Sequence, residues 1–166
     1  MNPMTKIRIE KITINIGCGD SKEKLEKATI LLERLTEKKI VITKTRTRTT
    51  FGSVKGKPIG CKVTLRRKSA EEFLKRAFEA VDKKLSKNVF DISGNFSFGV
   101  KEHIDIPGVK YDPDIGIMGM DVCVTLEKPG FRIKRKSMPS KIGKKHLIKP
   151  EEAMDWVSKS YGVVVV

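Results

Sequence analysis

Polar and apolar residues alternate from Lys6 to Ile16, in the pattern of a β-strand that buries one face. The isoleucines at positions 7 and 9 follow one phase of this repeat, and those at positions 12, 14 and 16 follow the opposite phase. The change of phase at Glu10 and Lys11 indicates either a β-bulge or a switch of the buried face. After it, Thr13 and Asn15 are expected to project away from the isoleucines.

Further segments also have strand character. Strand pattern restarts at Ile40, and from Thr43 to Thr49 threonines alternate strictly with Lys44, Arg46 and Arg48. The segment 59–66 is expected to bury its odd-numbered residues from Cys61 onward and to expose Lys62, Thr64 and Arg66. The segments 103–106 and 120–127 predict two more strands, and residues 163–166 could add another. Between the strand pattern that begins at Ile40 and the segment 59–66, Gly52, Gly56 and Pro58 predict a mobile loop from Phe51 to Lys57.

Three segments have the periodicity of amphipathic helices. Leucine and alanine at positions 25, 28, 32 and 35 predict a helix that begins after Asp20 or Ser21 and ends near Lys39. Ser69-Ala70-Glu71-Glu72 is typical of a capping box and predicts a second helix to about Leu85. Pro150 with Glu151 and Glu152 predicts the start of a third helix, which Gly162 ends.

Helices and strands are therefore mixed along a chain of 166 residues with no repeat of fixed period, a length that suits one domain. The expected fold class is α+β: a single domain (1–166) whose mixed, mostly antiparallel sheet has helices on one face and an open basic and polar face. Such an open face is a plausible platform for RNA.

The charge of the chain is unevenly distributed. Its formal net charge is +15, from 35 Lys and Arg against 20 Asp and Glu. Residues 38–68 hold eleven Lys and Arg without an acid, and residues 128–149 hold nine, also without an acid. The rest of the chain is net acidic. A merely solvated surface normally mixes both signs, so this clustering favours binding to a polyanion.

Other function classes find little support. The two histidines, His103 and His146, are neither paired with a nucleophile nor spaced as metal ligands; His103 is expected to be structural, and His146 to contact phosphate or solvent. Three distant cysteines suggest neither disulfides nor zinc and fit a reducing cytoplasm. The glycine-rich pieces match no nucleotide motif, and no apolar run is long enough to cross a membrane. No enzyme activity, cofactor, metal, small-molecule substrate or membrane partner is expected.

A set of short motifs covers most of residues 1–127: Asn2-Pro3-Met4, Ile9-Glu10-Lys11-Ile12, Asn15-Ile16-Gly17, Ile42-Thr43-Lys44, the run Pro58 to Arg66, Gly94 to Gly99, Lys101-Glu102 and Gly119-Met120-Asp121. In these motifs and their order, the chain resembles the large-subunit ribosomal protein L-five family, called L-eleven in eukaryotes. Residues 128–149 depart from the bacterial pattern and look like the archaeal and eukaryotic branch. The richness in lysine and isoleucine suggests an archaeal-type member.

This resemblance implies a structural role on cytoplasmic ribosomes. Family members bind 5S rRNA and large-subunit rRNA in the central protuberance, where they also meet neighbouring ribosomal proteins. A loop contacts tRNA in the peptidyl site. The 5S-binding positions fall on Asn15, Thr47 and Thr64, and Lys62, Arg66, Lys44, Arg46 and Arg48 are expected to add rRNA contacts. The tRNA loop falls on Phe51, Gly52, Ser53, Val54, Lys55, Gly56 and Lys57.

Two points stay open at the level of sequence. If Thr47 faces the RNA, strict alternation turns Arg46 and Arg48 away, unless the strand twists or ends before them. The basic insertion (residues 128–149) is expected to contact rRNA or a protein and to become ordered only on assembly, through Arg132, Lys134, Arg135, Lys136, Lys141, Lys144 and Lys145. A free-standing RNA-binding factor and an RNA-modifying enzyme are the competing hypotheses.

Overall fold

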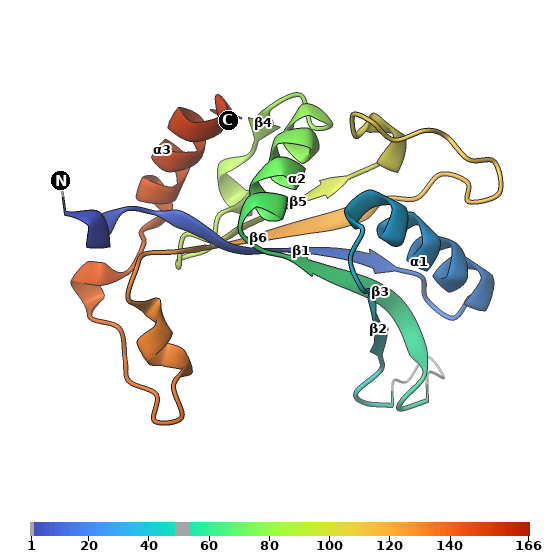
Figure 1. Ribbon diagram of the computed structural model, residues 1–166, viewed down its shortest axis with the longest axis horizontal. Helices are drawn as coiled ribbons and strands as arrows, with labels where there is room; N and C mark the ends of the chain where they lie inside the picture. Colours follow the sequence, from blue (N-terminus) through green and yellow to red (C-terminus); the bar gives the residue numbers. More distant parts are fainter. Residues whose placement is uncertain (1, 49–53) are drawn as a thin grey trace.

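A five-stranded sheet forms the centre of the structure, a computed structural model that describes residues 2–48 and 54–166 (Figure 1). The spatial order of its strands is β2-β3-β1-β6-β5, and each neighbouring pair is antiparallel. Their bounds are Arg8–Gly17 for β1, Val41–Lys44 for β2, Pro58–Leu65 for β3, Phe96–Val100 for β5 and Met120–Glu127 for β6. A second, parallel pair joins β4 (Lys84–Leu85) to β7 (Val164–Val165). The predicted α+β class is confirmed.

Three helices cover one face of the large sheet and leave the other face uncovered (Figure 1). They are α1 (Lys22–Thr36), α2 (Lys68–Glu79) and α3 (Pro150–Tyr161). Ser21 caps α1 by accepting a hydrogen bond from the Lys24 backbone N–H, and Gly162 ends α3 in the left-handed conformation. The apolar stripes of these helices pack on the isoleucines and valines of the inner sheet face to form one core.

The change of phase in the first strand is a β-bulge. The pairing of β1 with β6 shifts between Ile9, opposite Leu126, and Lys11, opposite Thr125. Because a bulge adds one residue to one strand, it restores the same buried face for the isoleucines before and after it. The extra residue is Glu10.

The predicted strand through Thr49 is wrong from Thr45 to Arg48, because β2 ends at Lys44, and Thr49 lies outside the described residues. The Thr45 backbone N–H donates to the Lys57 carbonyl, its hydroxyl donates to the Val54 carbonyl, and the Gly56 N–H donates to the Thr45 carbonyl. These bonds close a turn across the two ends of the connection, and the chain bends at Arg46 and Thr47. Alternation in sequence does not extend a strand where the chain bends away from the neighbouring backbone.

Two further predictions need correction. The capping box is wrong, because α2 begins at Lys68, its N-cap is Arg67, and the helix ends at Glu79 rather than near Leu85. Asp82 and Lys83 then adopt positive φ angles, which turn the chain into β4. The segment His103–Asp105 is a 3-10 helix (η3) rather than a strand. Other single turns of 3-10 helix are η1 (Pro3–Thr5), η2 (Lys87–Val89), η4 (Phe131–Arg135) and η5 (Lys144–His146). Among the described residues, no helix has the length and apolar character needed to span a membrane.

Candidate nucleic-acid interface

The uncovered side of the sheet, called here the open face, is polar. Strand register places Asn15 between Lys62 of β3 and Asp121 of β6. One step along β1, Thr13 lies between Thr64 and Cys123. Ile12, Ile14 and Ile16 alternate with these residues and are fully or almost fully buried on the helix side. The open face thus presents short hydrogen-bonding groups and lysines on a rigid backbone.

One end of the open face continues into a projection where β2 connects to β3, called here the hairpin leg (described residues 44–48 and 54–58). Lys44, Arg46, Thr47 and Arg48 are all exposed on it, as are Val54, Lys55 and Gly56. Lys57 is held more tightly, since its ammonium lies 3.0 Å from a carboxylate oxygen of Asp20. Phe51, Gly52 and Ser53 lie outside the described residues. Because β2 ends at Lys44, residues 46–48 are not part of a strand. Arg46 and Arg48 therefore need not point to the side opposite Thr47.

The basic insertion forms a second projection at the other end of the open face (Figure 1). Its start is held by Lys128, whose buried ammonium donates to a Glu152 carboxylate oxygen at 2.7 Å and to the Leu147 carbonyl at 3.4 Å. The Lys128 ammonium accordingly lowers the pKa of Glu152. The ring of His146 bonds to the Pro129 carbonyl through Nε2 at 2.8 Å, so this histidine ties the two arms of the insertion together.

The end of the insertion is fixed to the core. Ile148 is 2% exposed and packs on the turn before β5, where Gly94 has a φ of +74°. A Cβ on Gly94 would lie 2.6 Å from Cγ2 of Ile148, so this close approach requires glycine. Between its anchored ends, the insertion exposes basic side chains on Arg132, Lys134, Lys136, Lys141, Lys144 and Lys145.

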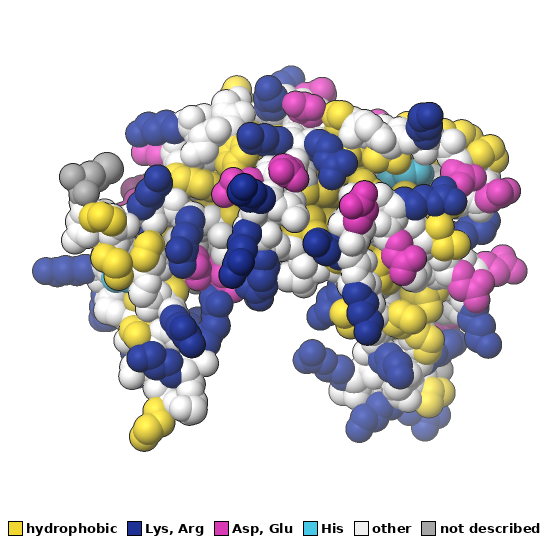
Figure 2. Space-filling model, viewed as in Figure 1, with side chains coloured by type: hydrophobic (Ala, Val, Ile, Leu, Met, Phe, Trp, Pro, Cys, Tyr) yellow, Lys and Arg dark blue, Asp and Glu magenta, His cyan; other side chains and the backbone are white. Residues whose placement is uncertain are grey.

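Together the two projections enclose a hollow under the open face. Figure 2 shows this hollow, with Lys and Arg side chains on both sides of it and no acidic side chain at the lower ends of the projections in this view. The two acid-free stretches, about ninety residues apart at their starts (38 and 128), are thus brought to the same side of the molecule. Converging cations around a concave polar surface suit a phosphate backbone.

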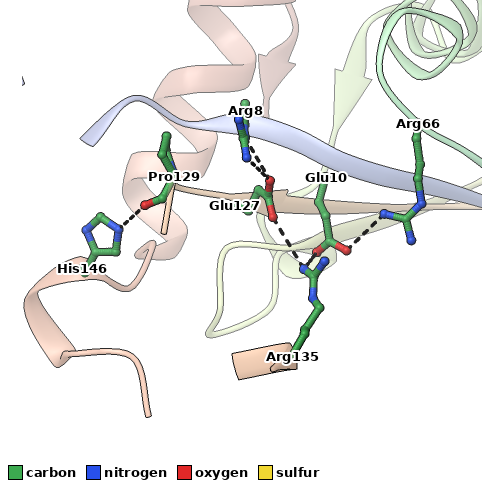
Figure 3. A network of polar contacts seen from close by, with 7 residues as sticks. All are labelled: Arg8, Glu10, Arg66, Glu127, Pro129, Arg135 and His146. Atoms are coloured by element: carbon green, nitrogen blue, oxygen red, sulfur yellow. Dashed lines mark hydrogen bonds and ion pairs between the residues drawn. The ribbon is translucent and has the colours of Figure 1, made fainter. Parts of the chain in front are cut away.

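Besides Lys57, two more of the predicted RNA-binding cations have acidic partners within the protein. Arg66 lies 3.5 Å from Glu10, and Arg135 contacts both Glu10 and Glu127 (Figure 3). The other expected contacts, Asn15, Lys62 and Thr64, are brought together on adjacent strands. Thr47 lies apart from them, beyond the end of β2.

Sequence reasoning missed several polar residues of the open face. Thr125 lies opposite Lys11, and Ser97 of β5 lies opposite Cys123. The signal for Thr125 is the alternation of Asp121, Cys123 and Thr125 with buried valines in β6, and the signal for Ser97 is its place between the buried Phe96 and Phe98 in β5.

Other candidate groups belong to the core. Phe96 and Phe98 are 3% and 7% exposed and stack against Phe78, so they are not available for base stacking. His103 is buried, and its Nδ1 accepts a hydrogen bond from the Met118 backbone N–H, as expected for a structural histidine. Burial raises the pKa of the Cys61 thiol to about 12, which makes it a poor nucleophile. In residues 2–48 and 54–166, no group of three His, Cys, Asp or Glu side chains is placed to hold a metal ion.

Comparison with known proteins gives a consistent picture. A family model described as ribosomal protein L5 matches residues 2–50, and a model of the C-terminus of the same family matches residues 58–157. The large ribosomal subunit protein uL5 of Sulfurisphaera tokodaii is 49% identical over 100% of this chain and 96% of its own length. The proteins of the same name from Methanococcus vannielii and Pyrobaculum aerophilum are 52% and 51% identical, each over 99% of this chain and 93% of their own length.

These matches cover both the sheet with its open face and the archaeal-type insertion. The chain therefore belongs to the ribosomal protein L5 family, as an archaeal-type member.

Proposed function

We propose that this protein binds 5S rRNA and large-subunit rRNA in the central protuberance of the ribosome and contacts tRNA in the peptidyl site. As a member of this family, the protein is a structural constituent of the large ribosomal subunit and not an enzyme. It acts on the ribosome, with rRNA and ribosomal proteins as its partners.

The observation that carries the proposal is the hollow between the hairpin leg and the basic insertion (Figure 2). An RNA helix lying in it would meet the open face with one groove and the cations of both projections with its backbone. A-form RNA presents a wide, shallow minor groove with 2′-hydroxyls, which short polar side chains can reach. This geometry favours recognition of a folded RNA over splayed single bases.

Cationic side chains and short polar side chains make different contributions to RNA binding. Lys62 and the cations of the projections hold phosphates and release counterions, which supplies most of the affinity and makes it fall with salt. Asn15 and Thr64 offer hydrogen bonds to 2′-hydroxyls and base edges, and so set the register of the RNA. Their backbones are fixed in the central strands β1 and β3, so little ordering is required on binding.

We assign the tRNA contact to residues 51–57, of which the structure describes 54–57. Val54 and Lys55 support this assignment, because both side chains are exposed. The basic insertion is proposed to contact rRNA or a neighbouring protein of the central protuberance. Its anchors at Lys128, His146 and Ile148 favour an insertion whose two ends keep their structure in the free protein. Ordering on assembly is then confined to the part of the insertion farthest from these anchors.

The first experiment is a gel shift of the purified protein with 5S rRNA, against a tRNA competitor, at two salt concentrations. A complex that survives the competitor and the higher salt supports specific recognition. A complex lost under either condition indicates a generic cationic surface and contradicts the proposal.

A further inference from the structure

The β-bulge of β1 places an acidic side chain where the open face meets the basic insertion. Glu10 is the extra residue of the bulge, and its side chain is only 8% exposed. In Figure 3 it points from β1 toward the insertion. An almost buried carboxylate is costly unless cations and hydrogen-bond donors surround it, so its partners are informative.

Two guanidinium groups from distant parts of the chain converge on Glu10. Arg66, directly after β3, approaches Oε1 at 3.5 Å, and Arg135, in η4 of the insertion, contacts Oε2. The same Arg135 amino group lies 3.5 Å from Oε2 of Glu127, whose Oε1 accepts from Arg8 at 2.7 and 2.9 Å. Three arginines and two glutamates thus form one network that joins the sheet to the insertion (Figure 3).

The exposure of the members is asymmetric. The Glu10 and Glu127 side chains are 8% and 13% exposed, whereas those of Arg66 and Arg135 are 54% and 49% exposed. Such pairs contribute little to stability when one partner is well solvated. A guanidinium has five N–H donors in a planar fork, and the contacts to Glu10 use one amino group of each arginine. Most N–H donors of both arginines therefore take no part in these contacts.

We propose that Glu10 is a positioning residue for RNA binding, which holds Arg66 and Arg135 side by side as a paired guanidinium site for a backbone phosphate. Glu127 supports the same arrangement from β6. Bidentate binding of phosphate depends on the orientation of the fork, and a carboxylate that fixes two forks reduces the ordering cost of the complex. This inference rests on the proposed RNA binding, and it assigns to an acid a role in holding a polyanion.

If Glu10 positions the arginines, removing its charge should change the affinity for RNA in the direction opposite to that expected from simple electrostatics. Removing a negative charge near an RNA site should strengthen binding if the charge only repels phosphate. Binding should also become stronger if Glu10 only kept the two arginines from contacting RNA. If Glu10 positions them, the isosteric variant Glu10→Gln should instead weaken binding to 5S rRNA about tenfold, the loss expected for about one phosphate contact with its charge-assisted bonds. The slope of log affinity against log salt should become shallower by about 1.

Asp121→Asn is the matched control. Asp121 is exposed on the same open face, its loss changes the net charge equally, and it has no ion-pair partner among the described residues. This control should bind RNA as tightly as the unmodified protein or more tightly. Circular dichroism and the thermal midpoint report whether either variant has lost its fold.

A second arm leaves Glu10 in place and so does not depend on the stability of Glu10→Gln. Arg135→Lys retains the charge but not the fork, so it should weaken binding by a similar factor, and unchanged binding would overturn the inference. Where Glu10→Gln is folded, adding Arg135→Lys to it should cost little more. Additive losses, or unchanged or tighter binding by folded Glu10→Gln, would overturn the inference. Failure of the unmodified protein to select 5S rRNA over tRNA would instead overturn the proposed function.

Discussion

The anchor of the basic insertion gives a quantitative prediction about stability. Lys128 is buried with its side chain 8% exposed, and its ammonium lies 2.7 Å from Glu152, whose side chain is 44% exposed. Glu152→Gln keeps an oxygen that can accept the hydrogen bond but removes the charge that compensates the buried ammonium. We expect this change to lower the free energy of unfolding.

The magnitude follows from the two exposures. A hydrogen bond between charged groups contributes roughly 1.5–3 kcal/mol, and one to a neutral group about 1 kcal/mol. Because solvent screens the half-exposed Glu152, the lower end applies, and the loss, as the difference between the two bonds, should be about 0.5 kcal/mol. For a chain of this length, that corresponds to a fall in Tm of about 1–2 °C.

Calorimetry of Glu152→Gln beside Glu151→Gln tests this reasoning. Glu151 lies in the same first turn of α3, is exposed, and forms no ion pair with any described residue. Both variants lose the same interaction with the helix dipole, so only the contact with Lys128 separates them. Equal Tm values at pH 7 would refute the assigned role of Glu152.

The pH dependence has a defined sign. Hydrogen bonding and charge from Lys128 lower the pKa of Glu152 from its ordinary value of 4.5. The carboxylate therefore stabilises the fold fully above pH 4.5, and this contribution is lost as the pH falls through the lowered pKa of the folded state. The difference in stability between the unmodified protein and Glu152→Gln should be constant near neutrality and should shrink below pH 4.5.

Three further predictions concern the interface and its support. Asn15→Ala should weaken binding to 5S rRNA about fivefold, through loss of about 1 kcal/mol of hydrogen bonding, and should leave the Tm unchanged. Ser97→Ala, on the edge strand of the same face, is its control in the gel shift. Equal affinities for both variants would contradict the role of Asn15. Lys55→Ala should leave 5S affinity within about twofold while reducing crosslinks to peptidyl-site tRNA on assembled subunits, and loss of 5S binding instead would show the leg to be misassigned. Gly94→Ala should lower stability by more than about 2 kcal/mol in chemical denaturation, because its Cβ would collide with Ile148 at a positive φ; a variant as stable as the unmodified protein would contradict this packing.

Local pattern was sufficient for much of the fold. The alternation of Ile12, Ile14 and Ile16 gave the buried face of β1 correctly, and with it the outward direction of Asn15. Ser21 and Gly162 marked helix ends through their own backbone chemistry. These features depend on residues near each other in sequence, so the sequence alone reveals them.

The sequence pattern predicted the wrong local structure where contacts with more distant residues determine it. Thr45 to Thr49 alternates as a strand does, yet β2 ends at Lys44 because the Thr45 N–H and hydroxyl bond across the connection to Lys57 and Val54. The capping box at Ser69 was displaced by an earlier helix start, with Arg67 at a positive φ. In both cases tertiary contacts outweighed a local preference.

Composition and periodicity are properties of the chain, so the residues alone reveal a basic α+β domain with two acid-free segments. The family is also read directly from the ordered motifs. The position of both basic segments beside one polar sheet face, and the contacts of Glu10 with Arg66 and Arg135, follow only from the folded structure. Strand order and the bulge in β1 arise from backbone pairing between distant segments, and this pairing sets which charges meet.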